Sequence, residues 1–477
     1  MSEAFLGIDL GTSSVKAVLV KNGRTVERSS AAYRTKDPEG WISGVREALS
    51  CLTGREEACA VGLSSQTGTY IVNDRYVLPW NGKEGFQELQ EIRKRIAGDV
   101  FQREIGMNHP ELTSYPLPKL LYARRHFGEL RSFYQPKDYL CRKLTGNRVS
   151  DPCTWRGLAD IWKGEYSSFL LDEMGIAKEI LPDLYEPQEA AGTVKAQASQ
   201  ELGLRKGIPV YTGLNDYFAA LLGMGVVNTG DWFDITGTSE HVGCIEDSLR
   251  PDSGLISGPY LQGFVHYGVT ASTGAALNFG RSVFPMELDW DSLTEERIRK
   301  APVFRPYLAG RRSPDPDPEA AGSFIGIREG CLGEDMAYAV LEGVAFSLYH
   351  IYETILSEAD EGILRPENRT GSNDAGRTGD SEHISGFRES AGIRVCGGAA
   401  VNPVLNHLKA ELFGKELWLM EEKDASAFGA ALTAMLGEGA IGKLPDIPAV
   451  CRILKVVEPE KRLRDVLLER YRIFRGG

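Results

Sequence analysis

A near-repeat divides this 477-residue chain into two halves. Residues 5–15 read FLGIDLGTSSV, and residues 232–242 read WFDITGTSEHV. Each is a short apolar run that breaks into Gly-Thr-Ser and then resumes as a strand, which is the pattern of a β-hairpin. The separation of about 227 residues, roughly half the chain, predicts two related domains that each begin with such a hairpin.

Each Gly-Thr-Ser turn has two interpretations. Taken alone, it is what an ordinary β-turn requires. It also suits phosphate, because Gly lets the backbone come close while successive N–H groups and hydroxyls point into one concavity. Two such turns favour phosphate binding by Gly11, Thr12 and Ser13 in the first half and by Gly237 and Thr238 in the second. Neither a P-loop (GxxxxGKS or GxxxxGKT) nor a GxGxxG motif after the first strand occurs, so this is not a P-loop or Rossmann site.

The composition is that of an ordinary globular protein, with 42% hydrophobic and 25% charged residues. A net charge of -12 without a long Lys/Arg run argues against nucleic acid or an anionic membrane as a partner. The eight cysteines include no CxxC pair, so neither disulfides nor a zinc site is expected. The first residues show no signal-peptide pattern, and no apolar stretch is long enough to span a bilayer. We therefore expect a cytoplasmic enzyme with reduced thiols.

Strand-like and helix-like runs alternate along the chain, which predicts an α/β fold. Strands are expected at 60–63, 69–72, 208–212 and 393–396. Helices are expected at 44–52, 85–96, 117–127, 134–144, 217–224, 272–279, 335–355, 402–413 and 460–474. Residues 365–390 are rich in Gly, Asn, Asp, Ser and Arg and nearly free of apolar residues, which predicts a mobile insertion. A passive surface loop is favoured there over a nucleotide-sensing lid.

Three charged residues next to these motifs could take part in chemistry. Asp9 ends the first strand; it either stabilises the turn or holds Mg²⁺ beside the phosphates. Lys16 lies on the second hairpin strand and is either solvated or reaches back to a phosphate. Asp216, after Asn215 in GLND, is either part of a helix N-cap or a ligand group at the carboxyl end of a strand. Phosphoryl transfer needs one acceptor for the hydroxyl proton, and an aspartate of ordinary pKa is adequate.

The sequence CGGAAVNP at 396–403 ends a strand and opens a helix. Gly398, with the glycine before it, permits close approach by a flat ring, and Asn402 could hydrogen-bond a base or ribose. A strand-to-helix turn with Asn402 as the cap would be the favoured interpretation without the upstream hairpins.

In this order, these pieces resemble the FGGY family of carbohydrate kinases, in the sugar kinase, Hsp70 and actin superfamily. Six blocks match over nearly the whole chain, among them GIDLGTSSVKAVL (7–19), GLSSQTGTYIV (62–72) and VCGGAAVNPVLNHLKAELFGKEL (395–417). The resemblance implies two actin-like (ribonuclease H-like) α/β domains with an ATP-binding cleft between them. It assigns the sugar site, the first phosphate loop and the catalytic Asp to 1–230, and the second phosphate loop and the adenosine site to 231–477.

The resemblance also implies roles for single residues. ATP and Mg²⁺ are the expected cofactors. Asp9 and Asp216 match the carboxylates near the metal, and Asp216 takes the place of the catalytic base. The residues that match ATP- or phosphate-binding positions are Gly11, Thr12, Ser13, Lys16, Gly237, Thr238, Gly274, Gly398 and Asn402. The residues that match sugar-facing positions are Gln66, Thr67, Gly68, Tyr115, Asn215 and Asp216.

The departures from the family pattern concern the substrate. Where xylulokinases usually carry Met-His and glycerol kinases Arg-Glu, this chain has Thr67-Gly68. The familiar WNDxR is WNGKE at 80–84, and the GER of the PYLxGER block is Gly-Arg-Arg at 310–312. Within the family, the ketose kinases for xylulose or sedoheptulose are the nearest. A ketose (pentulose or heptulose) is therefore favoured over glycerol, with other polyols left open.

Two other classes compete with a sugar kinase. A chaperone- or filament-type ATPase of the same superfamily is disfavoured by the sugar-loop and Asp216 blocks. A catalytically dead sugar sensor is disfavoured because both carboxylates are present and no basic patch or DNA-binding extension occurs. We expect a small-molecule sugar or polyol and ATP as partners, no nucleic acid or membrane, and leave a homodimer open.

Overall fold

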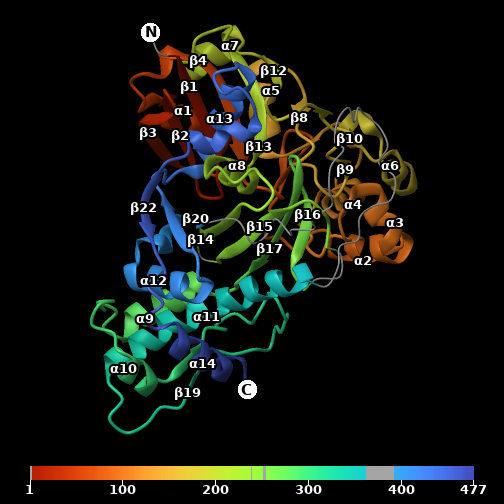
Figure 1. Cartoon of the computed structure of the whole chain (residues 1–477). Helices are drawn as coiled ribbons and strands as arrows, with labels where there is room; N and C mark the ends of the chain where they lie inside the picture. The colour runs from red at the N-terminus through yellow and green to blue at the C-terminus, as the bar shows by residue number, and fades with distance from the viewer. Residues whose placement is uncertain (1–2, 238, 251–253, 361–391, 477) are drawn as a thin grey trace, which may run out of the picture. The chain divides into compact units, whose positions relative to one another are not determined.

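The computed structural model describes residues 3–237, 239–250, 254–360 and 392–476 (Figure 1). Thr238 and the insertion expected at 365–390 lie outside these residues. The chain forms two compact units, each assembled from three segments. Unit 1 comprises Met1–Val227, Pro259–Gln262 and Glu422–Arg452. Unit 2 comprises Asn228–Gly258, Gly263–Glu421 and Ile453–Gly477.

Unit 1 is organised around a six-stranded mixed sheet in the order β12-β13-β4-β1-β2-β3. The first Gly-Thr-Ser turn connects β1 and β2, which pair antiparallel, so the first predicted hairpin is confirmed. On its other side β1 pairs in parallel with β4, and β4 with β13. The strands are β1 (Ala4–Leu10), β2 (Ser14–Lys21), β3 (Arg24–Ala32), β4 (Ala58–Ser65), β12 (Ala190–Thr193) and β13 (Pro209–Asn215).

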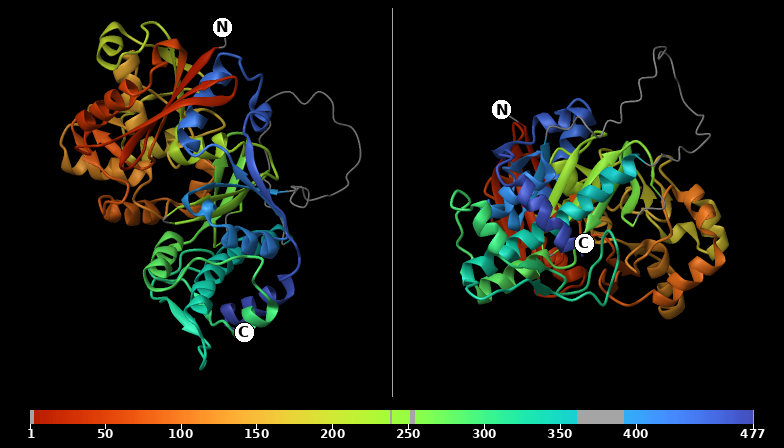
Figure 2. Two further views of the ribbon diagram at one scale, coloured as in Figure 1. Left: turned by 90° about the vertical axis from the view of Figure 1, so that its left-hand side faces the viewer. Right: turned by 60° about the horizontal axis from the view of Figure 1, so that its bottom comes forward.

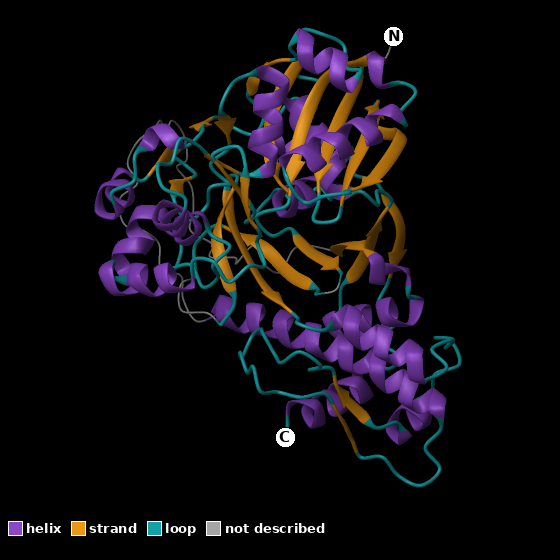
Figure 3. Ribbon diagram, turned by 180° about the vertical axis from the view of Figure 1, so that it is seen from behind, coloured by secondary structure: helices purple, strands orange, loops and turns teal. Residues whose placement is uncertain are grey.

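Helices pack on both faces of this sheet (Figure 3). One face carries α1 (Pro38–Ser50), α5 (Pro136–Thr145) and α7 (Ala196–Leu202). The other carries α13 (Ala425–Gly437), which also packs on α8 (Asp216–Gly223).

Two sheet glycines allow helix α13 to approach the strands at backbone contact distance. A Cβ atom on Gly7 of β1 would overlap the Ala427 carbonyl oxygen, and one on Gly62 of β4 would overlap that of Ala430. The segment that supplies α13 comes from the last quarter of the chain, far in sequence from the strands it covers. These glycines therefore serve the docking of a distant segment.

A second hydrophobic core in unit 1 lies under the loops that follow β4. It joins a three-stranded sheet, β6-β5-β7, to a group of helices around the buried Trp155. The elements are β5 (Tyr70–Val72), β6 (Tyr76–Leu78), β7 (Phe133–Tyr134), α2 (Phe86–Arg95), α3 (Gly98–Ile105), α4 (Pro116–His126) and α6 (Ser168–Met174). Two short two-stranded pairs complete it: β8 (Val149–Ser150) with β11 (Asp183–Leu184), and β9 (Ala159–Asp160) with β10 (Glu165–Tyr166).

Unit 2 has a seven-stranded sheet in the order β16-β17-β15-β14-β20-β21-β22. Strands β14 and β15 pair antiparallel across the second Gly-Thr-Ser segment, which confirms the second predicted hairpin. The strands are β14 (Trp232–Thr236), β15 (His241–Glu246), β16 (Ile256–Tyr260), β17 (Gly263–Val269), β20 (Gly392–Gly397), β21 (Glu416–Met420) and β22 (Ile453–Val457).

The helices of unit 2 gather around the long α11, and the C-terminal α14 packs beside it (Figure 2). They are α9 (Thr273–Val283), α10 (Glu295–Lys300), α11 (Gly333–Asp360), α12 (Pro403–Phe413) and α14 (Arg464–Arg475). A small ladder of β18 (Val303–Arg305) and β19 (Ser323–Ile325) packs against α11 and α14. Among the described helices, none combines the length and apolarity needed to cross a membrane.

The glycine contact with α13 predicts a sharp stability difference between two Gly→Ala substitutions. Gly62→Ala should lower the free energy of unfolding by about 1–3 kcal/mol, because α13 or β4 must shift to admit one methyl group. Gly98→Ala, at the start of α3 with nothing within 4 Å, should be neutral or stabilise by up to about 1 kcal/mol. Urea unfolding of both variants measures this, and equal midpoints would show that the close approach of α13 is not needed.

Candidate active site

Two aspartates of unit 1 lie at the carboxyl ends of strands. Asp9 is buried on β1, and one of its carboxylate oxygens, Oδ1, has no hydrogen-bond partner among the described residues. Asp216 is partly buried and follows β13 as the first residue of α8. Asn215 caps that helix, since its Oδ1 accepts a hydrogen bond of 3.0 Å from Phe218 N–H. The cap therefore belongs to Asn215, which leaves Asp216 for another role.

Both aspartates are harder to ionise than an exposed carboxyl. Burial raises the pKa of Asp9 to about 6, although the neighbouring Ser64 and the charge of Lys16 favour the ionised form. Burial, and then the negative charge of Asp9, raise the pKa of Asp216 to about 7. The sequence does not show how deeply the Asp216 carboxyl is enclosed, so this raised pKa could not be predicted from it. Such a pKa suits a group that exchanges a proton near neutral pH.

The first Gly-Thr-Ser turn presents its hydroxyls to solvent. Gly11 N–H closes the turn with a 3.0 Å bond to the Ser14 carbonyl oxygen. Thr12 and Ser13 are exposed, and their hydroxyls bond to no other described residue. Across the hairpin, Lys16 pairs in register with Asp9, and its Nζ lies 3.0 Å from Asp424 Oδ1. The turn thus has free donors beside one cation, which is an arrangement that can bind phosphate.

The loop expected to contact sugar is tied to Asp216. Thr67 N–H donates to Asp216 Oδ1 at 3.2 Å, and Gln66 N–H donates to the Leu10 carbonyl oxygen at 2.8 Å. Gly68 has a left-handed φ of 78°, and its N–H donates to Gln135 Oε1 at 3.2 Å. The loop therefore joins the ends of β1 and β13.

Gly68 also brings the other sugar-facing candidates close. A Cβ atom there would lie 2.7 Å from Ser114 Cβ and 3.3 Å from Trp80 Cβ. Tyr115 is the neighbour of Ser114, and Trp80 is 45% exposed. The structure thus places Gln66, Thr67, Gly68, Tyr115, Asn215 and Asp216 in unit 1.

The buried Lys137 connects the two strands that flank this loop. Lys137 Nζ lies 3.0 Å from Asp138 Oδ1, 3.0 Å from Asp151 Oδ2 and 3.1 Å from the Thr212 carbonyl oxygen. Its own N–H donates to Ser65 Oγ at 3.0 Å. Burial disfavours the charge of Lys137, but the two carboxylates outweigh burial and raise its pKa. The network fixes the end of β4 and the middle of β13, the two strands that precede the sugar loop and Asp216.

The altered WNGKE segment is also anchored by a buried lysine. Lys119 Nζ lies 3.0 Å from Glu84 Oε2 and 3.3 Å from the Gly82 carbonyl oxygen, and its side chain is fully buried. Thr113 Oγ1 donates to the same carbonyl at 3.0 Å. In place of the family's Asp, the WNGKE segment therefore has its own contacts, made by Gly82 and Glu84 with Lys119.

In unit 2 the second turn lies beside the Gly-Gly segment. β14 and β20 are parallel neighbours, with Thr236 opposite Gly397, so Gly237 and Gly398 follow adjacent strand ends. Thr236 Oγ1 accepts hydrogen bonds from Ala399 N–H at 2.9 Å and Ala400 N–H at 3.3 Å. The structure therefore brings together two of the predicted nucleotide-binding glycines.

A buried lysine of unit 2, Lys409, contacts both sides of the second turn. Lys409 Nζ on α12 lies 2.6 Å from Asp234 Oδ2 on β14 and 2.8 Å from Glu240 Oε1. All three side chains are fully buried. The lysine thus joins the two sides of the turn that carries Gly237.

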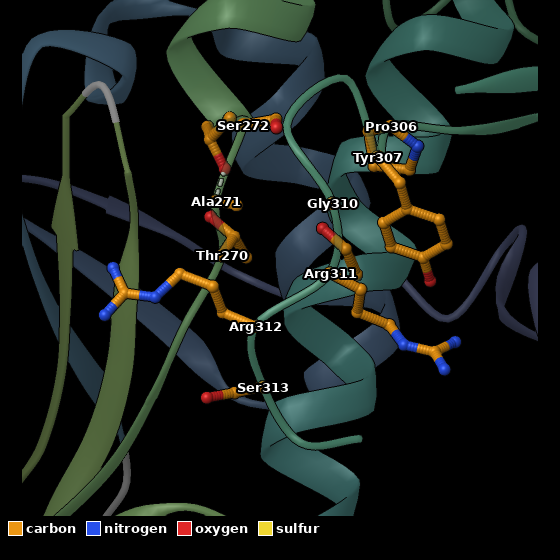
Figure 4. Close-up of a pocket in the computed structure, with 11 residues that line it drawn as sticks. Thr270, Ala271, Ser272, Pro306, Tyr307, Gly310, Arg311, Arg312 and Ser313 are labelled. Atoms are coloured by element: carbon orange, nitrogen blue, oxygen red, sulfur yellow. Dashed lines mark hydrogen bonds between the residues drawn. The ribbon is translucent and has the colours of Figure 1, made fainter. Parts of the chain in front are cut away.

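Asn402 and Gly274 occupy more ordinary positions. Asn402 caps α12, since its Oδ1 accepts a 2.9 Å bond from Leu405 N–H, so the cap interpretation is confirmed for this oxygen. Gly274 lies in the first turn of α9, next to a small pocket lined in part by Thr270, Ser272 and Arg312 (Figure 4). Burial, and then the charge of Arg312, lower the pKa of His241 at the start of β15 to about 4, which indicates that Arg312 faces the second hairpin.

The two halves of the chain match the two domain models of one family. The model for the "FGGY family of carbohydrate kinases, N-terminal domain" matches residues 4–223, and the C-terminal domain model matches 235–438. The chain belongs to the FGGY family of carbohydrate kinases. It is therefore an ATP-dependent sugar kinase, and a chaperone or filament ATPase is not favoured.

Several FGGY kinases are similar over nearly the whole chain. A xylulose kinase from Lactococcus lactis is 28% identical over 479 residues, covering 92% of this chain and 89% of the relative. A xylulose kinase from Bacillus subtilis is 26% identical, covering 91% and 88%. A gluconokinase from Bacillus subtilis is 25% identical over 496 residues, covering 94% and 90%. The relatives thus include kinases for two kinds of sugar.

The fold agrees with solved structures of the family. A ligand-bound xylulose kinase from Lactobacillus acidophilus matches with a TM-score of 0.80 at 22% identity, covering 99% of this chain and 97% of that one. A gluconate kinase from the same organism matches with a TM-score of 0.79 at 22% identity, covering 100% and 97%. The predicted α/β fold of two actin-like domains is confirmed.

Asp424, Arg312 and Lys137 belong to the candidate site but were not predicted from the sequence. Asp424 immediately precedes the ASAFGAAL block, but only the fold places it against Lys16. Arg312 belongs to the altered Gly-Arg-Arg triplet, which could have marked it. Lys137 carries no local signal, because its partners lie at 138, 151 and 212.

Removing the cation of Lys137 should destabilise unit 1 strongly. Lys137→Met leaves Asp138 and Asp151 buried without their counter-ion, so the free energy of unfolding should fall by about 3–5 kcal/mol. Lys143→Met, at an exposed position on the same helix, should cost less than about 1 kcal/mol. Urea denaturation compares the two, and equal losses would show that the network contributes no specific stability.

Proposed function

We propose that this kinase phosphorylates a ketose, with Asp216 as the base that accepts the proton of the attacked hydroxyl. The supporting observation is the 3.2 Å hydrogen bond from Thr67 N–H to Asp216 Oδ1, which links the candidate base to the candidate sugar loop. That bond and a 2.9 Å bond from Tyr217 N–H both reach Oδ1, so Oδ2 is the oxygen we assign to the sugar hydroxyl.

In the proposed reaction, the sugar hydroxyl oxygen forms a bond to the γ-phosphorus of ATP while the bond from that phosphorus to the bridging oxygen breaks. ADP leaves with the bridging oxygen, and the hydroxyl proton passes to Asp216. Because the transition state is loose, the proton moves late, and the base needs correct position more than high basicity. A pKa of about 7 leaves roughly half of Asp216 ionised at neutral pH.

The residues present fit a magnesium ion. Mg²⁺ is usually bound through one or two carboxylates together with waters and substrate phosphates. Asp9 offers a buried Oδ1 that bonds to no other described residue, and Asp216 lies close enough to sense its charge. Among the described residues no cluster of three or more His, Cys, Asp or Glu side chains could hold a metal, so the phosphates must complete the coordination. When bound, the ion would neutralise the phosphate charge.

We further propose which groups hold ATP. In 1–230, Gly11, Thr12, Ser13 and Lys16 form the first phosphate loop, supported by the free hydroxyls of the turn. In 231–477, Gly237 and Thr238 form the second loop, while Gly274, Gly398 and Asn402 border the nucleoside. Support comes from the adjacent strand ends that carry Gly237 and Gly398. Lys16 is shared with Asp424, so phosphate would compete with that carboxylate for the ammonium group.

A five-carbon ketose is the substrate class with most support. Relatives at 26–28% identity are named xylulose kinases, and they match over about nine-tenths of the chain. Gln66 and Thr67, whose polar groups could recognise hydroxyls, directly precede Gly68, and Gly68 lies close to Ser114 and Trp80. A seven-carbon ketose, a polyol and gluconate remain the comparisons to include in any assay.

The role of Asp216 predicts both a rate loss and a pH profile. Asp216→Ala should lower kcat by about 10²–10⁴-fold with ATP affinity nearly unchanged. In the wild type, kcat/KM should rise with pH through about 7, because the base acts only when deprotonated and its pKa is raised. Coupled ADP detection measures both, with the exposed Asp172→Ala as control. More than half of wild-type turnover in Asp216→Ala would remove Asp216 from the mechanism.

The sugar loop should determine substrate choice rather than the chemical step. Gln66→Ala should raise KM for the preferred sugar and reorder the ranking among ketoses, since an unmatched hydroxyl or amide is costly in a buried site. KM for ATP should change little. We would measure kcat/KM over ketoses, polyols and gluconate, with the exposed Gln90→Ala as the matched control. A uniform drop across the panel would instead point to Trp80 or Tyr115 as the selective contacts.

A further inference from the structure

Unit 2 contains a polar cavity of about 230 Å³, which shares Tyr307 and Arg311 with the smaller pocket near Gly274. Five segments contribute to it: the β18 strand, the loop after it, β19, helix α11 and the end of α14. Its charged and polar lining includes Arg305, Arg311, Asp317, Ser323, His350 and Arg475. Three guanidinium groups at one cavity stand out in a chain whose net charge is -12.

The three arginines are weakly compensated by carboxylates. Arg305 Nε donates to the Phe474 carbonyl oxygen at 2.9 Å, and Arg311 Nε donates to that of Asp315 at 2.6 Å. Neither forms an ion pair with a carboxylate in the described part of the chain. Arg475 Nη1 lies 3.8 Å from Glu353 Oε2, and both side chains are nearly half exposed, so that pair is weak.

Two carboxylates, those of Asp317 and Asp315, lie near the arginines. Asp317 Oδ1 accepts a 3.1 Å bond from Glu319 N–H in its own turn. Asp315 Oδ2 lies 3.4 Å from His350 Nε2, and its side chain is 60% exposed. Burial, and then the charge of Arg475, lower the pKa of His350 to about 4, so this imidazole is neutral at pH 7. Among the side chains that line the cavity, three arginines therefore face one carboxylate, that of Asp317.

Arg311 is one of the departures from the family pattern, since the PYLxGER block has Glu at this position. Its guanidinium lies over the Tyr307 ring at 5.5 Å, on one side of the 306–313 loop. Arg312, the next residue, points to the opposite side of the loop (Figure 4). The reversed charge at position 311 therefore faces both this cavity and the smaller pocket near Gly274, whereas Arg312 lines only the smaller of the two.

We propose that this cavity binds the phosphate monoester of a small sugar or polyol while ADP and Mg²⁺ occupy the phosphate loops. Planar guanidinium groups are the side chains best suited to phosphate oxygens, because each presents parallel N–H donors. The volume corresponds to about seven or eight waters at roughly 30 Å³ each, more than a phosphate group alone fills. Tyr307 and Phe474 offer carbon surface, and Ser323 a hydroxyl, for the rest of the molecule.

The test is calorimetric titration of the full chain with ribose 5-phosphate, with saturating ADP and Mg²⁺ to block the phosphate loops. The wild type should bind one equivalent, and Arg311→Gln and Arg305→Gln should each weaken binding at least tenfold. Arg472→Gln, an exposed position on the same helix as Arg475, is the matched control and should stay within twofold. Arg311→Lys should give an intermediate loss, which keeps the test valid if Arg311→Gln folds poorly.

Several outcomes would overturn the proposal. They are no binding to the wild type, binding abolished by ADP, or Arg311→Gln and Arg305→Gln within twofold of wild type. Inorganic phosphate should bind at least tenfold more weakly than ribose 5-phosphate, and equal binding would refute the ester assignment. Because no turnover is measured, failure here leaves the proposed kinase reaction untouched, and failure of Asp216 as base leaves this site untouched.

Discussion

A buried lysine between two carboxylates is the interaction on which each unit's candidate site depends. In unit 1, Lys137 connects Asp138 and Asp151 to the end of β4 and the middle of β13. In unit 2, Lys409 connects Asp234 and Glu240 across the second turn. Buried charges are tolerated only when each lies close to an opposite charge, as the two lysines and their carboxylates do here. Once paired, these charges hold the strands within a narrow range of positions, which loops alone would not achieve.

Burial in the same part of unit 1 also raises the pKa of Asp9 and Asp216. Asp9 lies near the end of β1, and Asp216 follows β13 of the same sheet. Burial raises the pKa of each carboxyl, so each keeps its proton to a higher pH than a surface carboxyl. Phosphoryl transfer asks a protein for position and charge compensation more than for covalent participation. Two carboxylates of raised pKa and an exposed turn, all held by buried strands, meet that demand.

Much of the fold could be predicted because its signals are local. Both hairpins, the strands near 60, 208 and 393, and the helix at 402–413 follow from apolar runs and turn residues, and the structure has them within a few residues. The first helix begins at Pro38 rather than at the predicted residue 44, because Asp37 caps it and proline suits the first helical position. Packing decides the rest: the contact of Lys16 with Asp424 and the pKa of Asp216 depend on segments about 200 to 400 residues apart.

The origin of α13 has a consequence for biosynthesis. The helix that docks on Gly7 and Gly62 is made more than 350 residues after the strands that receive it. While the ribosome is still adding the intervening chain, that face of the sheet has no permanent cover, and its apolar side chains are exposed to other chains or to chaperones. A fragment that ends near residue 230 would remain in this condition, so the amino-terminal half reaches its native state only when synthesis is almost complete.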